Sequence, residues 1–387
     1  METQGLAFGL TDQQLAVREL ARSFAEKELR PAVSGFDESQ EFPFALVSRL
    51  AELGFMGITF PEELGGAGLT PLEAIVIIEE LARVDPSIAL TVASHNSLCT
   101  GHIMQFGSED QRRAYVPALA SGRALGAWGL TEPGSGSDAG GMKTTAVRDG
   151  SDWVLNGSKT FITQGSVGSV YVILALTDPA SPRNAISAFI LERDTPGFII
   201  GKKENKLGMR CSDTATLLFE NVRVPGRNLI GAPGEGFKQA LQVLDGGRVG
   251  IAALSVGIAQ GAFEASVKYA RERSQFGKPI GETQAIQWKL ADMATEIEAA
   301  RLLTQQAAWK QAEGLPLTLA ASEAKYFASE VAVRAANEAV QIHGGYGFIK
   351  DFPVEKFYRD VKLMTIGEGT SEVQKMIIAR QLIGRGA

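Results

Sequence analysis

The hydrophobic spacing of this sequence changes twice along the chain, and that change constrains the fold more than any other feature. Residues 1–122 place apolar side chains at helical intervals, as at Ala16, Leu20 and Phe24, whereas residues 123–230 follow the spacing of strands. Helical spacing returns over residues 231–387. We therefore predict an α+β fold of three domains with these bounds: an N-terminal all-α domain, a small middle β domain and a C-terminal helical bundle.

Three capping signals locate helices in the N-terminal domain. Thr11 with Gln14 and Ser108 with Gln111 have the spacing of a capping box, in which two side chains satisfy free amides at a helix start. Residues 70–73 (Thr-Pro-Leu-Glu) add a proline at the first helical position. We expect a helix to begin directly after each signal.

Turn residues delimit the elements of the other two domains. Apolar runs at residues 171–174 and 188–191, with the pairs Asp149-Gly150 and Asn156-Gly157, predict tight hairpins in a small antiparallel sheet or barrel. After residue 231, glycines at 277, 314, 344, 345 and 384 bound four predicted helices of about 15 to 35 residues, which short connections would pack into an antiparallel four-helix bundle.

Composition and charge argue against several classes of function. The chain has 38 Lys and Arg against 44 Asp and Glu and no long basic run, so we expect neither a nucleic acid nor a membrane partner. Cys99, Cys211 and the three histidines lack the spacing of a metal site or a disulfide framework. We find no apolar run of about 18 residues, no signal-peptide core and no transit pattern, and we interpret the protein as cytoplasmic. A processed organellar protein would have the same features.

Two glycine-containing stretches resemble nucleotide motifs without their structural context. Residues 134–139 (GSGSDA) fit the G-x-G-x-x-A dinucleotide pattern, but a strand and turn follow where a helix should face the pyrophosphate. Residues 157–160 (GSKT) end like a phosphate loop and lie between strands. We do not expect a Rossmann site.

Aromatic and hydroxyl side chains gather around the first of these stretches. Trp128, Leu130 and Thr131 precede it, and residues 159–163 (KTFIT) follow it. On small strands such side chains either wall a flat heteroaromatic ring or simply pack a barrel. The residues alone favour barrel packing.

The sequence Asp245-Gly246-Gly247-Arg248 interrupts a helical pattern. Interior glycines cost about 1 kcal/mol each relative to alanine, so another group should approach the backbone closely there. A crossing helix would explain the glycines, and so would an extended ligand beside the Arg248 guanidinium. Arg273, in the last turn of the same helix, either complements the helix dipole or holds a phosphate in a bidentate contact.

Eight stretches together resemble the acyl-CoA dehydrogenase family over nearly the whole chain. They are LTEPGSGSD (130–138), KTFIT (159–163), KLGMRCSDTATLLFENVRVP (206–225), LDGGRVGIAA (244–253), RERSQFGKPI (271–280), QIHGGYGF (341–348), YRD (358–360) and EGTSEVQ (368–374). The resemblance implies the family's helix, barrel and bundle architecture. It also implies FAD-dependent oxidation of an acyl-CoA thioester to trans-2-enoyl-CoA, electron transfer to an electron-transferring flavoprotein, and a homotetramer.

The resemblance further implies the binding residues. Around FAD we expect Trp128, Leu130, Thr131, Phe161, Thr163, Thr370 and Glu372, with Arg273, Gln275 and Phe276 on the pyrophosphate and adenine side, together with Gln341, Gly344 and Gly345 of a neighbouring subunit. At the acyl-CoA we expect Ser137, Asp245, Arg248 and Gly369, and we expect no metal.

Glu368, between Gly367 and Gly369, matches the family's catalytic base. A positioned carboxylate is the usual base for removing a proton next to a carbonyl, and the glycines leave room for a flat substrate. A helix capped by Thr370 or Ser371 favours the ionised carboxylate, whereas exclusion of water raises its pKa. We expect a base that is charged when the site is empty and strengthened by substrate. In this family the thioester oxygen is polarised by the base residue's own amide and a flavin ribose hydroxyl.

The residue before Arg248 distinguishes between subgroups of the acyl-CoA dehydrogenase family. Isovaleryl- and long-chain-type relatives carry their base immediately before the arginine of the 245–248 stretch, where this chain has Gly247. This difference favours straight-chain or 2-methyl-branched substrates, and the EGTSE spelling favours short-chain members, so fatty acid β-oxidation and branched-chain amino acid catabolism are both open. His343 is interpreted as a packing residue. The alternatives are an acyl-CoA oxidase that uses oxygen, a flavin monooxygenase, which would normally lack the glutamate, and a non-catalytic helical scaffold.

Overall fold

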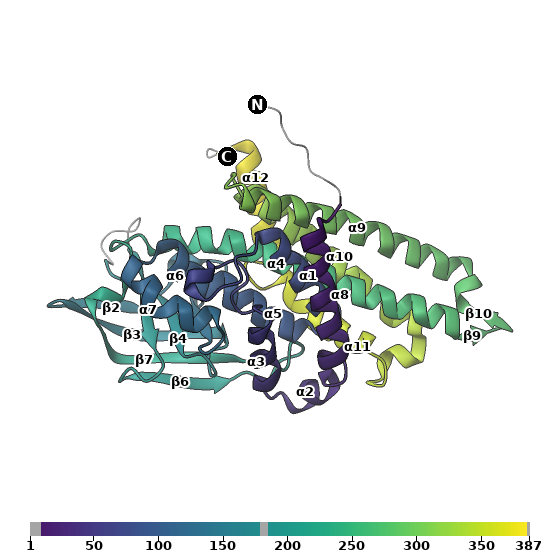
Figure 1. Ribbon diagram of the computed structural model, residues 1–387, viewed down its shortest axis with the longest axis horizontal. Helices are drawn as coiled ribbons and strands as arrows, with labels where there is room; N and C mark the ends of the chain where they lie inside the picture. Colours follow the sequence, from purple (N-terminus) through teal and green to yellow (C-terminus); the bar gives the residue numbers. More distant parts are fainter. Residues whose placement is uncertain (1–8, 179–184, 385–387) are drawn as a thin grey trace.

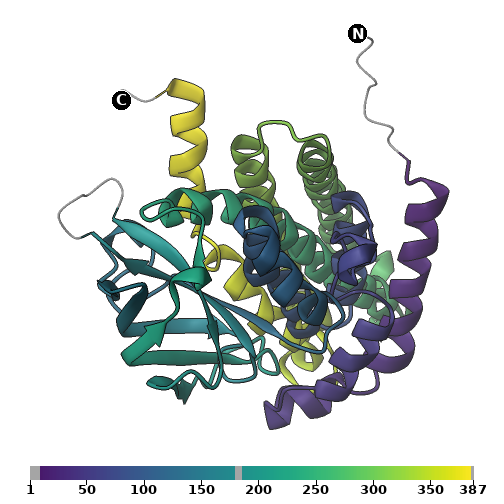
Figure 2. The ribbon, with the colours of Figure 1, turned by 60° about the vertical axis from the view of Figure 1, so that its left-hand side comes forward.

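The computed structural model describes residues 9–178 and 185–384 and has three parts: N-terminal helices, a β domain and a bundle of long helices (Figure 1). In Figure 2 the β domain lies on the left, and the N-terminal helices lie in the centre and along the right-hand edge, where they pack against the long helices. The N-terminal helices are α1 (Asp12–Phe24), α2 (Val33–Ser39), α3 (Phe44–Glu52), α4 (Pro71–Ala82), α5 (Pro86–Ser94), α6 (Gly101–Phe106) and α7 (Glu109–Ala120). Two π-helical turns, η1 (Ala25–Leu29) and η3 (His95–Thr100), continue α1 and α5.

The three predicted capping boxes are confirmed. The side chains of Thr11, Thr70 and Ser108 cap α1, α4 and α7, and the backbone amide of each cap residue donates to the side chain of the third helical residue. Local sequence was sufficient here because both partners of each bond lie within one helical turn.

The apolar face predicted for α1 is wrong in part. Ala16 is exposed and Leu20 is 44% exposed, whereas Ala21 and Phe24 are buried. A tertiary contact fixes the rotation of the helix, because the Arg22 guanidinium binds the Glu80 carboxylate of α4 through Nε–Oε2 (3.0 Å) and Nη2–Oε1 (2.9 Å).

The middle domain is a twisted eight-stranded sheet in the order β6-β7-β3-β2-β4-β5-β8, with β1 added beside β4. Most neighbours are antiparallel, and β4 pairs in parallel with β1 and with one residue of β2. The strands are β1 (Gly126–Gly129), β2 (Thr145–Asp149), β3 (Asp152–Thr163), β4 (Val170–Leu176), β5 (Ile186–Glu192), β6 (Phe198–Lys203), β7 (Thr214–Val224) and β8 (Leu229–Ile230).

One of the two predicted hairpin turns is correct. Asp149 and Gly150 connect β2 to β3, with Asp149 paired to Asp152. Asn156-Gly157 instead lies inside β3, where the register against β7 shifts and Gly157 has φ +142°. A Cβ atom there would come within 2.6 Å of the Thr144 hydroxyl, so the glycine admits a close approach at a bulge.

The C-terminal part packs three long helices with two shorter ones. They are α8 (Gly236–Glu272), α9 (Gln284–Ala312), α10 (Thr318–His343), α11 (Val354–Asp360) and α12 (Ser371–Ile383). A two-stranded hairpin of β9 (Ser274–Gln275) and β10 (Lys278–Pro279) joins α8 to α9 and lies at the end of the molecule opposite the β domain (Figure 1). Helix α4 packs against α8 and α9, so the N-terminal helices share the core of the bundle.

Helix α8 corrects one expectation from composition. It is long and apolar enough to meet the length and hydropathy criteria for a membrane span, contrary to the prediction that no such stretch exists. Of its most apolar 18-residue window, 78% is buried inside the protein, which is the environment of a core helix.

Candidate active site

The carboxylate of Glu368 is carried by a tight turn between the 3-10 helix η8 (Val361–Thr365) and α12. Glu368 has φ +54°, a left-handed conformation that is uncommon for a residue with a side chain, and Gly369 follows with φ +96°. The Thr370 side chain accepts a hydrogen bond from the Val373 amide and caps α12. The Ser371 hydroxyl donates to Glu330 Oε1 (2.6 Å), so Thr370 is the cap residue of the two that the sequence offered.

The Glu368 side chain lies against the backbone of α8 at Gly247. A Cβ atom on Gly247 would stand 2.2 Å from Glu368 Oε2 and 3.2 Å from Leu98 Cδ2. Oε2 is buried and has no hydrogen-bond partner among the described residues. The close approach predicted from the two glycines is therefore made at Gly247 by this carboxylate, whereas Gly246 meets only the Gln311 side-chain nitrogen at 3.1 Å.

Two predicted substrate residues form an ion pair beside this carboxylate. The Arg248 guanidinium donates to Asp245 Oδ1 (2.6 Å), and the Thr318 hydroxyl of α10 donates to Asp245 Oδ2 (2.6 Å). Arg248 is 4% exposed, and its Nε has no partner in the described protein. The Glu368 charge acts on Arg248, so the guanidinium supplies a positive charge to the site.

Lys325 and Gln374 hold the turn through hydrogen bonds to its backbone carbonyls, and neither was predicted as a residue of the site. The Lys325 ammonium of α10 donates to the Gly369 carbonyl (2.7 Å). The Gln374 side-chain amide of α12 donates to the carbonyls of Glu368 (3.2 Å) and Gly369 (3.0 Å). Both side chains are fully buried. The available sequence signal for Lys325 was a lysine on the side of α10 that otherwise buries alanine and serine.

Burial raises the pKa of Glu368 to about 7, against the opposing charges of Arg248 and Lys325. The residue as a whole is partly exposed, but Oε2 itself is buried, and the surroundings of the carboxyl oxygens decide its ionisation. The sequence predicts a base that is charged when the site is empty. Burial by protein atoms opposes this charge, and Arg248 and Lys325 support it.

The residues predicted to border a flat ring come together at the ends of β1 and β3. Trp128 and Leu130 are each 9% exposed and share an apolar cluster with Leu98 and Leu244, which connects them to η3 and to the first turns of α8. The backbone after β1 is fixed by Lys159, whose ammonium donates to the Leu130 carbonyl (3.1 Å).

Further contacts hold the two segments of this wall together. The Thr160 amide donates to the Thr131 carbonyl (2.9 Å), and Lys159 also binds Glu132 Oε1 (2.7 Å). Phe161 has φ +57° and is 66% exposed, while Thr163 at the end of β3 is half-buried. A bulky aromatic ring held outward in a left-handed conformation suits contact with a bound ring better than barrel packing.

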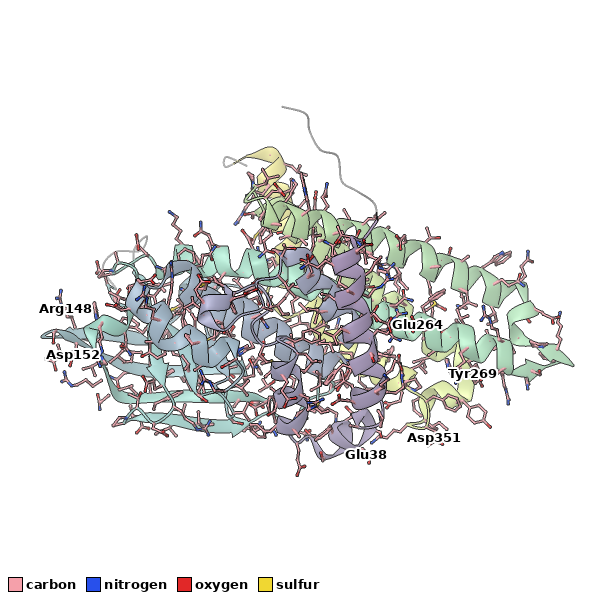
Figure 3. The ribbon with its side chains drawn as sticks, viewed as in Figure 1. Glu38, Arg148, Asp152, Glu264, Tyr269 and Asp351 are labelled. Atoms are coloured by element: carbon pink, nitrogen blue, oxygen red, sulfur yellow. The ribbon has the colours of Figure 1, made fainter. Side chains whose placement is uncertain are left out.

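A second group of predicted cofactor residues surrounds a separate cavity of about 510 Å³ at the far end of α8. Arg273, Gln275, Gly344 and Gly345 line it, and the Arg273 guanidinium lies 5.3 Å from the centre of the Tyr346 ring. An ideal Cβ on either glycine meets no atom within 4 Å, so the backbone is open to a ligand. Tyr269, which also lines the cavity, lies away from the β2–β3 hairpin marked by Arg148 and Asp152 in Figure 3.

The two groups are not brought together in one chain. At 1.5 Å per residue, the part of α8 between Arg248, beside the Glu368 turn, and Arg273 is about 37 Å long, so the cavity at Arg273 lies far along this helix from the turn. Phe276, between β9 and β10, is fully exposed with φ +52°, and Gln341 is exposed near the end of α10. His343 is buried, donates from Nδ1 to the Ala339 carbonyl (2.8 Å) and stacks on Tyr269, as a packing residue does.

The remaining predicted residues, Ser137 and Glu372, are both exposed. Ser137 lies in the loop after β1. Glu372 lies exposed in the first turn of α12, and the pKa of its carboxyl is lowered by hydrogen bonds at the helix start.

These features satisfy what a flavin dinucleotide needs. A partner-free carboxylate faces a glycine, an outward aromatic ring and two pinned strand ends form a wall, and an arginine stands beside glycines whose backbone is uncovered. Side-chain and backbone donors of this kind suit the ring edge and the phosphates, respectively.

Three family descriptions match the sequence in order. They are "Acyl-CoA dehydrogenase, N-terminal domain" over residues 11–123, "Acyl-CoA dehydrogenase, middle domain" over 127–222 and "Acyl-CoA dehydrogenase, C-terminal domain" over 234–383.

Curated relatives match almost the full length. "Acyl-CoA dehydrogenase" of Bacillus subtilis is 48% identical over 97% of this chain and 99% of its own. "Acyl-CoA dehydrogenase, short-chain specific" of Clostridium acetobutylicum is 46% identical over 97% and 99%.

Solved structures agree with this similarity. Butyryl-CoA dehydrogenase from Megasphaera elsdenii has a TM-score of 0.96 at 45% identity, over 98% of this chain and all of that one. A chain in the structure described as "Electron transferring flavoprotein of Acidaminococcus fermentans: Towards a mechanism of flavin-based electron bifurcation" has a TM-score of 0.97 at 47% identity, over 98% and 100%. A glutaryl-CoA dehydrogenase from Mycobacterium smegmatis in complex with FADH2 has a TM-score of 0.92 at 33% identity, over 98% and 96%.

Proposed function

The chain belongs to the acyl-CoA dehydrogenase family, and on this premise we propose that it oxidises short-chain or 2-methyl-branched acyl-CoA thioesters to trans-2-enoyl-CoA with Glu368 as the base. The observation that carries the proposal is the buried, partner-free Glu368 Oε2 against Gly247. A structural carboxylate in such a place would be paired, because an unpaired buried charge is costly.

Proton removal follows from the position and the charge of Glu368. The ionised carboxylate takes the proton from the carbon next to the thioester carbonyl, and a base with a pKa near 7 is well matched to operation near neutral pH. Arg248 and Lys325 favour the ionised form, while Leu98 and the α8 backbone keep water from the oxygen that accepts the proton.

FAD, when bound, supplies the hydride-accepting chemistry at the neighbouring carbon. Leu130, Thr131, Phe161 and Thr163 would border its ring, with Trp128 supporting Leu130 in the same apolar cluster. Thr370 and Glu372, at the start of α12, are the other two residues that the family resemblance assigns to FAD. Arg273, Gln275 and Phe276 would hold the pyrophosphate and adenine side, together with Gln341, Gly344 and Gly345.

The proposed contacts of the acyl-CoA are Asp245, Arg248 and Gly369 near the Glu368 side chain, together with Ser137 in the loop after β1. The Glu368 amide makes no hydrogen bond to any described residue, which leaves it available to polarise the thioester oxygen. A carbonyl polarised in this way makes the adjacent carbon acidic enough for a carboxylate to deprotonate it.

We also propose that the working form is a homotetramer. Arg273 lies about 37 Å along α8 from Arg248, which is beside the Glu368 turn, and this length supports a cofactor site shared with the hairpin of another copy. The exposed Phe276 is then covered on assembly. For the reoxidation step we propose an electron-transferring flavoprotein in the cytoplasm. An acyl-CoA oxidase remains the rival, and oxygen consumption without that partner would identify it.

Anaerobic titration of the FAD-loaded protein with acyl-CoA thioesters tests the function. We expect bleaching of the flavin absorption with butyryl-CoA and, in a parallel panel, with isobutyryl- or 2-methylbutyryl-CoA. Glu368→Gln should bind FAD and substrate but bleach at least about 100-fold more slowly, the usual contribution of a general base. Undiminished bleaching by this variant would refute the assignment of the base, and a protein that stays colourless with added FAD would refute the enzyme.

A further inference from the structure

Lys325 is a buried ammonium without an ion-pair partner. Its side chain is fully buried in α10, and it forms no ion pair within residues 9–178 and 185–384. The one hydrogen bond from its Nζ goes to the Gly369 carbonyl (2.7 Å), directly after the catalytic carboxylate. An ammonium buried in this way costs free energy, because a protonated lysine has three donors and loses its hydration.

The other buried lysines of the described protein show the usual arrangement. Lys159 binds Glu132 at 2.7 Å, and Lys356 binds Asp85 at 2.9 Å and Asp360 at 2.6 Å. A lysine that only filled space in α10 could be replaced by methionine, which has a similar length and no charge to bury. The position of Lys325 beneath the Glu368 turn therefore needs a different explanation.

Resting on the function proposed above, we propose that Lys325 is a positioning residue: its ammonium anchors the Gly369 carbonyl and supplies the buried positive charge that keeps the Glu368 carboxylate ionised. The anchor matters because Glu368 and Gly369 both have positive φ angles, a conformation that surrounding contacts must maintain. Gln374 shares this anchoring, since it donates to the same carbonyl (3.0 Å). Unlike the neutral Gln374 amide, Lys325 brings a positive charge to this carbonyl.

The charged groups around the turn are consistent with this role. Arg248 of α8 and Lys325 of α10 both lower the pKa of Glu368, which burial raises. Arg248 is already bound to Asp245, so part of its charge is neutralised. Lys325 is influenced by Glu330 and Glu372 as well, but its direct contact is a neutral carbonyl. Burial lowers the pKa of Lys325 to about 8, and the Glu368 charge opposes that change, so each group favours the charged form of the other.

Two substitutions separate the charge from the anchor. Lys325→Gln removes the charge and retains an amide donor for the Gly369 carbonyl, whereas Lys325→Met removes both. Lys289→Met is the matched control, because Lys289 joins α9 to Glu338 of α10 through a partly exposed ion pair outside the site. Flavin absorption and thermal unfolding of the holoenzyme verify that each variant is folded and loaded.

The rate of anaerobic flavin reduction is then measured against pH. We expect the acid limb of the profile to move upward by about one pH unit in Lys325→Gln and Lys325→Met, as loss of a nearby charge implies. The methionine variant should also lose at least about fivefold in its pH-independent maximum, because a misplaced base reacts more slowly. The control should keep the acid limb and the maximum of the native protein.

An infrared titration provides a readout that does not depend on turnover. The C=O band of protonated Glu368, identified by its loss in Glu368→Gln, should titrate at higher pH in Lys325→Gln than in the native protein.

The inference is wrong if the midpoint of the C=O band and the acid limb of the rate profile both stay within about 0.2 pH unit of the native values in both lysine variants. Because Glu368→Gln separately tests the base, a full loss of reduction in that variant with unchanged lysine variants would refute this inference alone and leave the proposed function standing. If neither lysine variant folds, the native protein must still show the Glu368 band titrating below the pH at which Lys325 loses its proton, and the reverse order would refute the inference.

Discussion

At the scale of single residues, the candidate site depends on Gly247, which has no side chain. Glu368 Oε2 occupies the volume that a Cβ on Gly247 would need. Relatives of the isovaleryl and long-chain type are expected to carry a glutamate at that position of the helix. A carboxylate from α8 and a carboxylate from the 367–369 turn would compete for one space, and this chain resolves the competition with a glycine on the helix.

Replacing Gly247 by alanine should therefore disable the base while leaving the fold intact. The new methyl group would force the carboxylate away from its position, and a displacement of about 1 Å is expected to slow flavin reduction by roughly 100-fold. Gly246→Ala is the matched control, since its Cβ would meet only the end of the Gln311 side chain. The control should retain its rate and gain up to about 1 kcal/mol in unfolding free energy, as alanine is the better helix former. Stopped-flow reduction and urea unfolding of both variants measure these effects, and a fully active Gly247→Ala would contradict the placement.

The raised pKa of Glu368 also predicts a pH-dependent stability difference. A carboxyl whose pKa is higher in the folded than in the unfolded protein does not affect stability below pH 4.5, where it is protonated in both states. It destabilises the fold progressively as pH rises toward about 7, by up to roughly 3 kcal/mol. Glu368→Gln should thus be more stable than the native protein at pH 8 and equal to it near pH 4. Thermal unfolding at the two pH values measures the difference, which should be absent if the carboxyl is well solvated.

At the scale of elements, α11 ties the three parts of the chain together. Lys356 of this helix binds Asp85, the cap of α5, and Asp360 of its own last turn. Asp360 also accepts the Met209 amide (2.6 Å) from the loop between β6 and β7. The lysine and both aspartates are buried, so this cluster joins the N-terminal helices, the β domain and the bundle at one point.

Lys356→Met should be strongly destabilising for this reason. It would leave two buried carboxylates without a cation, and breaking a buried pair in this way typically costs about 3–5 kcal/mol. The control is Lys350→Met, which removes the exposed pair with Glu38 and should change the unfolding free energy by less than about 1 kcal/mol. Denaturant unfolding of the two variants distinguishes the sites, and equal stabilities would show that the buried cluster contributes little.

At the scale of the whole molecule, the proposed cofactor residues are divided between its two ends. The wall at Leu130, Thr131 and Phe161 lies in the β domain, and Arg273 lies where α8 meets the terminal hairpin (Figure 1). One chain therefore carries half of each of two proposed sites. Under the proposed function, copies must assemble to bind the cofactor, and assembly does more than cover apolar surface.

Hybrid oligomers of two variants test whether each cofactor site is built from two subunits. Arg273→Ala should lose retention of FAD, and Glu368→Gln should lose reduction by substrate, so each variant alone is inactive. Hybrids made by co-expression contain sites with Glu368 from one subunit and Arg273 from another, and they should recover measurable activity. A mixture of the separately assembled variants serves as the control. Hybrids as inactive as either parent would show that both residues act within one chain, and sedimentation equilibrium should report the tetramer.

Much of the local structure followed from the sequence alone. The capping boxes at Thr11, Thr70 and Ser108, the β2–β3 turn and the long helices were predictable because their partners lie a few residues apart. The family motifs also singled out Glu368, and the fold class followed from the order of hydrophobic periods.

Only the tertiary structure decided how the site is built. The contact of Glu368 with Gly247, the unpaired charge of Lys325 beneath it and the separation of Arg273 from Thr131 join segments that are distant in sequence. The shift of the Glu368 pKa to about 7 has the same origin. Desolvation depends on which atoms surround a group, and that is set by the packing of helices and not by the residues adjacent to it in the chain. The sequence thus determined which carboxylate to consider, and the packing determined its charge and its surroundings.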